Sequence, residues 1–225
     1  MFTMKKVTLI AIALFLLAGS YVGSAQDAKG AWTTGADFFN RYNWRGSDLG
    51  NSPVVQPTIK YVSGAFTAGA WGSYSTSSST TATEADLFMT YAFKSGFSLT
   101  ATDYYFPSEP GSTGHYFNYG KNKYQFFEIS PSYTKGPFTI TGNYFFANAN
   151  NDVYLEADYA FKTVTFILGG GNQMYTTNTN FNICNIGIST TKNVVLTDKF
   201  TLPLTGKVIL NPDKQQIFFV FGFTI

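Results

Sequence analysis

The sequence has 225 residues, of which 44% are apolar, 18% aromatic and 12% charged. The charged share is about half of that in an average soluble protein, while a mean hydropathy of -0.02 excludes a bundle of membrane-spanning helices. Residues 1–25 carry two lysines and no acidic residue, so residues 26–225 have a formal charge of zero and do not indicate a nucleic-acid partner.

The first 25 residues are typical of an export signal. Two lysines precede an apolar run, Val7–Ala18, and the small residues Gly23, Ser24 and Ala25 then form a cleavage site. The apolar run is too short for a membrane-spanning helix, which needs about 18 residues or more. We therefore expect a signal peptide at 1–25 and a mature domain at 26–225.

The rest of the sequence consists of short runs in which apolar and polar residues alternate, separated by turn residues. This period of two is the pattern of β-strands. The connections alternate between long, polar segments and tight turns, as do the outer loops and periplasmic turns of outer-membrane barrels. The pattern predicts about twelve strands, at 31–45, 54–63, 66–74, 84–93, 97–106, 125–135, 138–146, 152–162, 164–174, 181–190, 200–210 and 216–225.

Two connections depart from this rhythm: 191–199 is long for a periplasmic turn, and 211–214 is short for an outer loop. Ten or fourteen strands therefore stay open as alternatives. Twelve is preferred because an even number leaves both ends of the barrel domain in the periplasm and lets the last strand pair with the first. Closure matters because an unpaired strand edge in hydrocarbon leaves backbone N–H and C=O groups without partners.

The final strand has one face of large apolar residues, namely Ile217, Phe219, Phe221, Phe223 and Ile225. Such a strand at the end of an exported chain is typical of outer-membrane barrels. The expected fold is an all-β, single antiparallel transmembrane β-barrel in the outer membrane of a Gram-negative bacterium. The last residue is Ile225 where many such barrels end in Phe, but Phe221 and Phe223 keep the pattern, so the barrel-assembly machinery remains an expected partner along with membrane lipid.

Charged residues on the strands indicate which face points inward. A charge facing lipid near the membrane midplane costs about 2–4 kcal/mol. The charged side of each strand should therefore face the lumen, and aromatic residues at strand ends should form two interfacial girdles. The expected lumen residues are Asp37, Arg41, Arg45, Lys60, Glu84, Asp86, Glu128, Glu156, Asp158 and Lys207; the expected girdle residues are Trp32, Trp44, Trp71, Tyr91, Phe93, Tyr104, Tyr105, Tyr133, Tyr144, Phe145, Tyr159 and Phe161.

Residues for catalysis or metal binding are scarce. The sequence has one histidine, His115, in a glycine-rich loop, and one cysteine, Cys184, on a strand. Neither is placed with the partners that a nucleophilic or metal site requires. The run Gly169–Gly171 is not followed by a helix or by the Lys-Ser/Thr pair of a phosphate loop, so it indicates a crowded or bent wall. We expect no enzyme activity, no metal and no cofactor.

The segment from Asp37 to Tyr74 carries a Tyr-x-x-Arg-Gly turn (Tyr42, Arg45, Gly46), a Pro and a Gln at the start of the second strand, and a glycine-rich third strand with Trp. In these features the chain resembles the TorF-type family of outer-membrane porins, in which the porin function is itself inferred. The tail from Phe181 to Phe223 is similar to a Bacteroidetes-like branch. The resemblance implies a small outer-membrane barrel and supplies no catalytic residues.

These observations leave three hypotheses. The first is a porin that lets small polar solutes diffuse through a lumen whose charges tune selectivity. The second is a sealed structural or surface-interaction barrel, in which the lumen charges neutralise one another and loops 75–83 and 107–124 make contacts. The third is a soluble exported β-barrel or lipid-binding protein, which does not account for a continuous outward apolar band.

Overall fold

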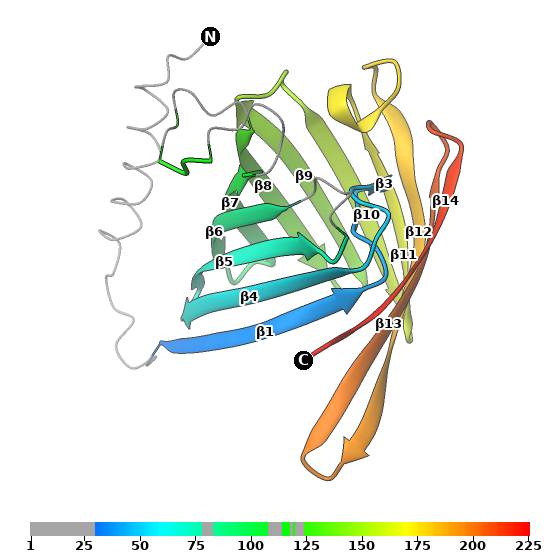
Figure 1. Cartoon of the computed structure of the whole chain (residues 1–225). Helices are drawn as coiled ribbons and strands as arrows, with labels where there is room; N and C mark the ends of the chain where they lie inside the picture. Colours follow the sequence, from blue (N-terminus) through cyan, green and yellow to red (C-terminus); the bar gives the residue numbers. More distant parts are fainter. Residues whose placement is uncertain (1–29, 78–82, 108–113, 118, 120–123) are drawn as a thin grey trace.

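The computed structural model describes residues 30–77, 83–107, 114–117, 119 and 124–225. The expected signal peptide, and parts of loops 75–83 and 107–124, lie outside the described residues. Twelve strands form a closed antiparallel barrel (Figure 1), as the sequence predicts. They are β1 (Ala31–Phe39), β4 (Val54–Ser63), β5 (Phe66–Ser75), β6 (Glu84–Ala92), β7 (Phe97–Tyr105), β8 (Gln125–Lys135), β9 (Phe138–Ala147), β10 (Val153–Phe161), β11 (Val164–Gly171), β12 (Asn182–Thr197), β13 (Phe200–Asn211) and β14 (Gln216–Thr224).

The last strand closes the barrel against the first. On β1, Phe38 lies opposite Phe223 of β14 on one side and Val55 of β4 on the other. Backbone hydrogen bonds of 3.0 Å in both directions between Ala36 and Ile225 extend this seam by one pair. Because β1 has a strand on each side, the sheet closes on itself.

The two faces of the wall differ as the alternation predicts. On β14, Ile217, Phe219 and Phe221 are 54–64% exposed on the outside, whereas Phe218 and Val220 are buried. Similar exposed residues occur around the wall, among them Leu87, Tyr91, Leu155, Leu168 and Ile188. Within the described residues no helix is long and apolar enough to cross a membrane.

The connections also differ between the two rims of the barrel. At one rim, which we call the turn end, residues 64–65, 93–96, 136–137, 162–163 and 198–199 join the strands. The remaining connections, all longer than these except 212–215, lie at the opposite rim, the loop end. The expected long turn at 191–199 is wrong. Strand β12 runs on to Thr197 and pairs with β13 from Ile186↔Leu210 to Thr197↔Phe200, because Thr191, Val194 and Val195 favour extended backbone. This hairpin projects past the turn end (Figure 1).

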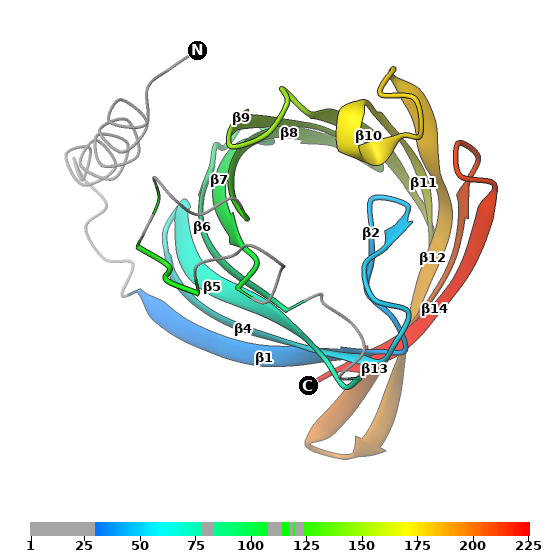
Figure 2. The same ribbon diagram turned by 45° about the horizontal axis from the view of Figure 1, so that its top comes forward.

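The expected first strand, 31–45, is also wrong at its end. Strand β1 stops at Phe39, and the chain then turns into the barrel (Figure 2). Two short strands, β2 (Asn43–Trp44) and β3 (Ser47–Asp48), form a hairpin there. The reversal between them has left-handed backbone at Arg45 (φ 49°) and Gly46 (φ 82°), so strand alternation cannot continue through it. We call residues 40–53 the lumen loop.

Candidate functional site

The lumen loop is held together by its own polar contacts. Arg41 Nη1 donates to Asp48 Oδ2 at 3.0 Å, and the Leu49 backbone N–H donates to the carbonyl of Tyr42 at 2.8 Å. Asp48 Oδ1 also accepts from the backbone N–H of Asn51 at 3.2 Å. Two of the residues expected to line the lumen from the first strand, Arg41 and Arg45, therefore belong to a compact loop rather than to the wall.

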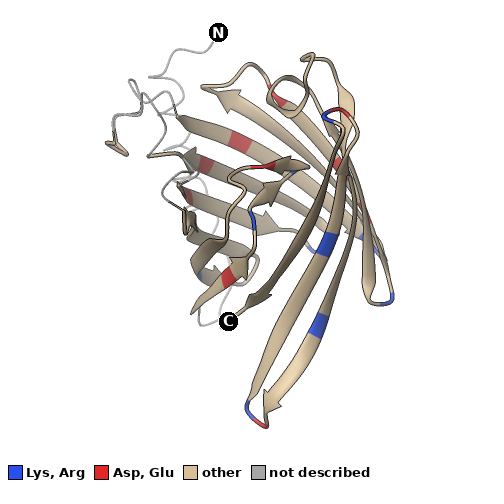
Figure 3. Cartoon of the chain, turned by 45° about the vertical axis from the view of Figure 1, so that its right-hand side comes forward, with Lys and Arg blue, Asp and Glu red and all other residues tan. Residues whose placement is uncertain are grey.

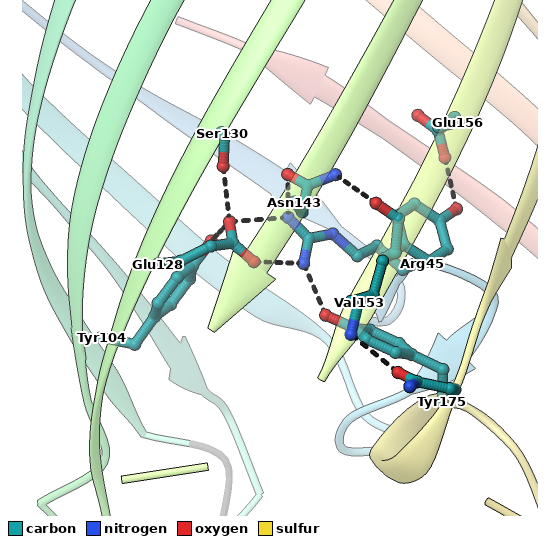
Figure 4. Close-up of polar contacts among 10 residues, drawn as sticks. Arg45, Tyr104, Glu128, Ser130, Asn143, Val153, Glu156 and Tyr175 are labelled. Atoms are coloured by element: carbon teal, nitrogen blue, oxygen red, sulfur yellow. Dashed lines mark hydrogen bonds and ion pairs between the residues drawn. The ribbon is translucent and has the colours of Figure 1, made fainter. Parts of the chain in front are cut away.

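Arg45 lies at the tip of this loop and reaches the opposite wall (Figure 4). Its guanidinium binds Glu128 in bidentate fashion, at 2.6 Å and 2.8 Å. It also donates to Asn143 Oδ1 and Tyr175 Oη, both at 2.6 Å. The planar guanidinium suits this arrangement, since it offers several donors in a fixed fork and stacks on aromatic rings. Its Cζ lies 4.5 Å from the Trp44 ring centroid.

Glu128, the negative partner of the ion pair, also has several hydrogen-bond donors around it. Glu128 is 1% exposed. Its Oε1 accepts from Ser130 Oγ at 2.8 Å and from Tyr104 Oη at 3.1 Å, in addition to Arg45. Burial alone would lower the pKa of the Arg45 guanidinium, but the hydrogen bonds and charge of Glu128 raise it above its usual value. Arg45 therefore stays charged inside the barrel.

Aromatic side chains pack around the ion pair. Trp44 lies within 5.5–6.3 Å, between ring centroids, of Tyr104, Phe145 and Tyr175. Burial raises the pKa of Tyr175, although Arg45 opposes this shift, so its hydroxyl stays protonated and accepts from Arg45 with its oxygen. The lumen at this end thus has an aromatic core, with Tyr154 and Cys184 buried in the same cluster.

This cluster corrects part of the expected aromatic girdle. Trp44, Tyr104 and Phe145 were expected at the interface but pack inside the barrel, because the lumen loop provides a surface for them. Tyr105 is 5% exposed, with its ring against Tyr116. By contrast, six of the expected girdle residues are exposed, namely Trp32, Tyr91, Phe93, Tyr133, Tyr144 and Phe161.

Gly46 allows the tip to seat closely on the wall. A Cβ at this position would lie 1.9 Å from the carbonyl oxygen of Cys184, and the backbone is left-handed. Only glycine meets both conditions without strain. Asn211 Nδ2 donates to the Gly46 carbonyl at 2.9 Å, and Lys214 Nζ donates to Ser47 Oγ at 2.8 Å. The tip therefore contacts β12 and the end of β13 as well as β8.

The acidic pair of β6 lies on the other side of the loop. Glu84 is 1% and Asp86 6% exposed, and each has one carboxylate oxygen that is buried without a hydrogen-bond partner. Tyr42 of the loop is buried with its ring 5.6 Å from that of Trp71. Burial first, and then the charges of Glu84 and Asp86, raise the pKa of Tyr42 well above its usual value. The loop thus covers two residues that were expected to line an open path.

The remaining expected lumen residues are spread along the wall. Glu156 Oε2 accepts from Tyr154 Oη at 2.5 Å and from Asn185 Nδ2 at 3.0 Å. Asp37 Oδ1 accepts from Thr224 Oγ1 at 2.5 Å. Asp158, on β10 two residues beyond Glu156, is partly buried. Lys60 is exposed on the same side of β4 as the buried Gln56, toward the turn end.

The charges are unevenly distributed around the barrel. Acidic residues gather on β6, β8 and β10, while β12 and β13 carry the basic residues Lys192 and Lys207 (Figure 3). A cavity of about 470 Å³ lies beside the loop on the basic side. Its lining comprises Asp37, Phe39, Arg41, Tyr42, Asn43, Gln56, Ser189, Thr191, Thr205, Lys207, Val220 and Thr224.

Several residues of this site were not predicted from the sequence. They are Asn143, Tyr175, Asn211 and Lys214, which contact the loop from the wall or its connections. The alternation of β9 offers a signal for Asn143, which shares a side with Thr141. Nothing in the sequence indicates the others, because their role depends on where the loop lies.

Among the described residues, no group of three or more His, Cys, Asp and Glu side chains is placed to hold a metal ion. No protein-family model matches the chain, and no curated protein matches it either. The resemblance to TorF-type porins therefore rests on the residues quoted above and stays a prediction.

Proposed function

We propose that the protein is an outer-membrane barrel through which small polar solutes diffuse, with the lumen loop setting the aperture. The closed sheet and the exposed apolar outer face support a membrane location, because a closed barrel leaves no strand edge unpaired in lipid. Membrane lipid and the barrel-assembly machinery are the partners that this location implies. The proposed mechanism uses no cofactor and no catalytic residue.

The observation that carries the proposal is that the loop narrows the lumen while a polar cavity remains beside it. The inner wall toward the turn end is also polar. Hydroxyl pairs bridge neighbouring strands at Thr90 and Thr100 (2.8 Å), at Ser132 and Thr141 (2.9 Å), and at Thr191 and Thr205 (2.9 Å). Such a wall suits water and hydrated solutes, whereas a purely structural lumen is filled by side chains.

A second candidate function is a sealed structural barrel. The observation that favours it is the complete pairing of Arg45 and Glu128 within an aromatic cluster. In this case the loop end would stay closed to solutes, and the lumen loop would serve to fill the barrel rather than to select what passes.

The test is single-channel recording in a planar lipid bilayer, using protein expressed from the whole chain and purified from membranes. Diffusion predicts discrete conductance steps for the unmodified protein, and a larger step for Arg45→Ser because the loop tip loses its anchor. The matched control is Lys162→Ser in a turn at the other rim, which should leave the step unchanged. If the unmodified protein inserts and stays silent, the sealed barrel is the correct function.

A further inference from the structure

The cavity beside the lumen loop has a lining that differs from the rest of the lumen. It contains three charged residues, Asp37, Arg41 and Lys207, together with four serine and threonine side chains, at Ser189, Thr191, Thr205 and Thr224. Its volume of about 470 Å³ is many times the share of one water molecule in the liquid, which is about 30 Å³. The cavity is therefore large enough for a small organic solute.

Two of its charges lack a charged partner. Arg41 is paired with Asp48, but no ion pair involves Asp37 or Lys207 within the described residues. Asp37 accepts a hydrogen bond from the hydroxyl of Thr224, and the Lys207 ammonium lies 5.6 Å from the Phe39 ring centroid. The cavity thus presents one carboxylate and one ammonium group that do not neutralise each other directly.

Polar groups of the loop also lack partners at this wall. Both polar atoms of the Asn43 side chain and Nε of Arg41 are buried without a hydrogen bond. Buried polar groups in proteins almost always have a partner, which can be a ligand or an ordered water. Since Asn43 and Arg41 line the cavity, a solute there could satisfy them after a small side-chain rotation.

We propose that this cavity binds a small zwitterionic solute that carries both a carboxylate and an ammonium group. Lys207, assisted by Arg41, holds the carboxylate, and Asp37 holds the ammonium group. A simple anion would leave Asp37 without a charged partner, and a simple cation would leave Lys207 without one. The inference deepens the proposed function, on which it rests, by assigning a solute class to the path through the lumen.

The test is isothermal titration calorimetry on the folded barrel in detergent, with protein expressed from the whole chain. The probes are unbranched ω-amino acids from glycine to 6-aminohexanoate, titrated alongside butanoate and butylammonium as single-charge controls. Binding of at least one amino acid about tenfold tighter than both controls supports the site, since each single-charge control can make only one of the two charge-assisted contacts. Equal affinities for all probes, or no binding, would overturn it.

Variants locate the site. Lys207→Met and Asp37→Asn should each weaken binding about tenfold, whereas Lys207→Arg should retain it because the charge remains. Lys60→Met is the matched control, since Lys60 is a second lysine on the inner side of the wall but does not line the cavity. Heat-modified gel mobility verifies that each variant is folded. If Lys60→Met weakens binding as much as Lys207→Met, the assignment to this cavity is wrong.

The binding and conductance experiments test two separate claims, the solute class and diffusion through the lumen. Conductance without zwitterion binding overturns the assigned solute class and leaves the diffusion pathway. Binding without conductance supports the site and overturns diffusion through the lumen.

Discussion

The two ends of the lumen show two ways of placing polar residues inside one barrel. At the loop end, Glu128 is buried and Arg45 is largely buried, and each has several partners within 3.1 Å. Toward the turn end, Lys60 is exposed and the wall carries single hydroxyl pairs such as Ser132 and Thr141. The same inner face therefore changes from a buried, packed network to an accessible polar surface.

This difference shows that burial determines how much a charged side chain in the lumen affects the stability of the barrel. A buried charge without its partner is costly, because the surrounding protein cannot replace water. An exposed charge keeps its hydration, so its removal costs little. The charges near the loop should hence determine stability, and those toward the turn end should contribute little to it.

The largest expected effect on stability comes from removing the positive charge of Arg45 at the loop end. Arg45→Met leaves Glu128 buried without its partner and should lower the free energy of unfolding by about 3–5 kcal/mol. Urea unfolding in lipid vesicles measures this change. The double variant Arg45→Met, Glu128→Met should recover much of the loss, because no uncompensated charge remains. Lys162→Met, at an exposed turn, is the control. If Arg45→Met lowers the free energy of unfolding no more than Lys162→Met does, burial does not decide the contribution of these charges to stability.

The next largest effect concerns the seating of the loop. Gly46→Ala places a Cβ 1.9 Å from a backbone oxygen, so the tip must move out and single-channel conductance should rise. Gly64→Ala is the matched control, because Gly64 is also left-handed but has open space around its Cβ position. This control should cost only about 1–2 kcal/mol of backbone strain and leave conductance unchanged. Equal conductance changes in the two variants would show that the clash of the added Cβ is not the cause of the change.

A smaller effect of opposite sign is expected at the acidic pair. Glu84 and Asp86 are both buried beneath the loop, and each has a carboxylate oxygen without a hydrogen-bond partner. Glu84→Gln removes one negative charge and should raise the free energy of unfolding by about 1 kcal/mol. The same urea titration measures it, with Asp198→Asn in the exposed β12–β13 turn as the control. A clear loss of stability would mean that the charge of Glu84 has a partner in solution.

The smallest effect is expected on β9 toward the turn end. Thr141→Val removes a hydroxyl pair with Ser132 in a solvated wall and should change stability by about 0.5 kcal/mol. Asn143→Leu, two residues along the same side, removes contacts with Arg45 and with the Tyr154 carbonyl. It should cost about 1–3 kcal/mol. Similar losses at both positions would indicate that the lumen is equally packed at its two ends.

The fold was predictable because alternation is a property of neighbouring residues. The twelve strands, their tight turns and the apolar side of β14 follow from local patterns in the sequence. The crowding expected at Gly169–Gly171 is also confirmed, since a Cβ at Gly169 would lie 2.0 Å from Tyr154 Oη.

The site was less predictable because the lumen loop continues the alternation of β1 for six more residues. Arg41, Asn43 and Arg45 have the period of a strand, yet Gly46 and the contacts at the far wall draw this segment inward. Alternation could indicate that Glu128 faces inward, but its partner is a loop residue. That pairing depends on the three-dimensional position of the loop, which no local pattern encodes.

The contacts of the lumen loop also bear on the order of folding. Arg45 binds Glu128 across 83 positions of sequence, and Gly46 accepts from Asn211 across 165. Contacts that span such separations form slowly, because the intervening chain must first be ordered. The last hairpin contributes Asn211 and Lys214, so the loop can reach its final place only after that hairpin has formed. Until then the aromatic cluster around Trp44 and Phe145 stays hydrated, and expulsion of water from this cluster is a late event in the maturation of the barrel.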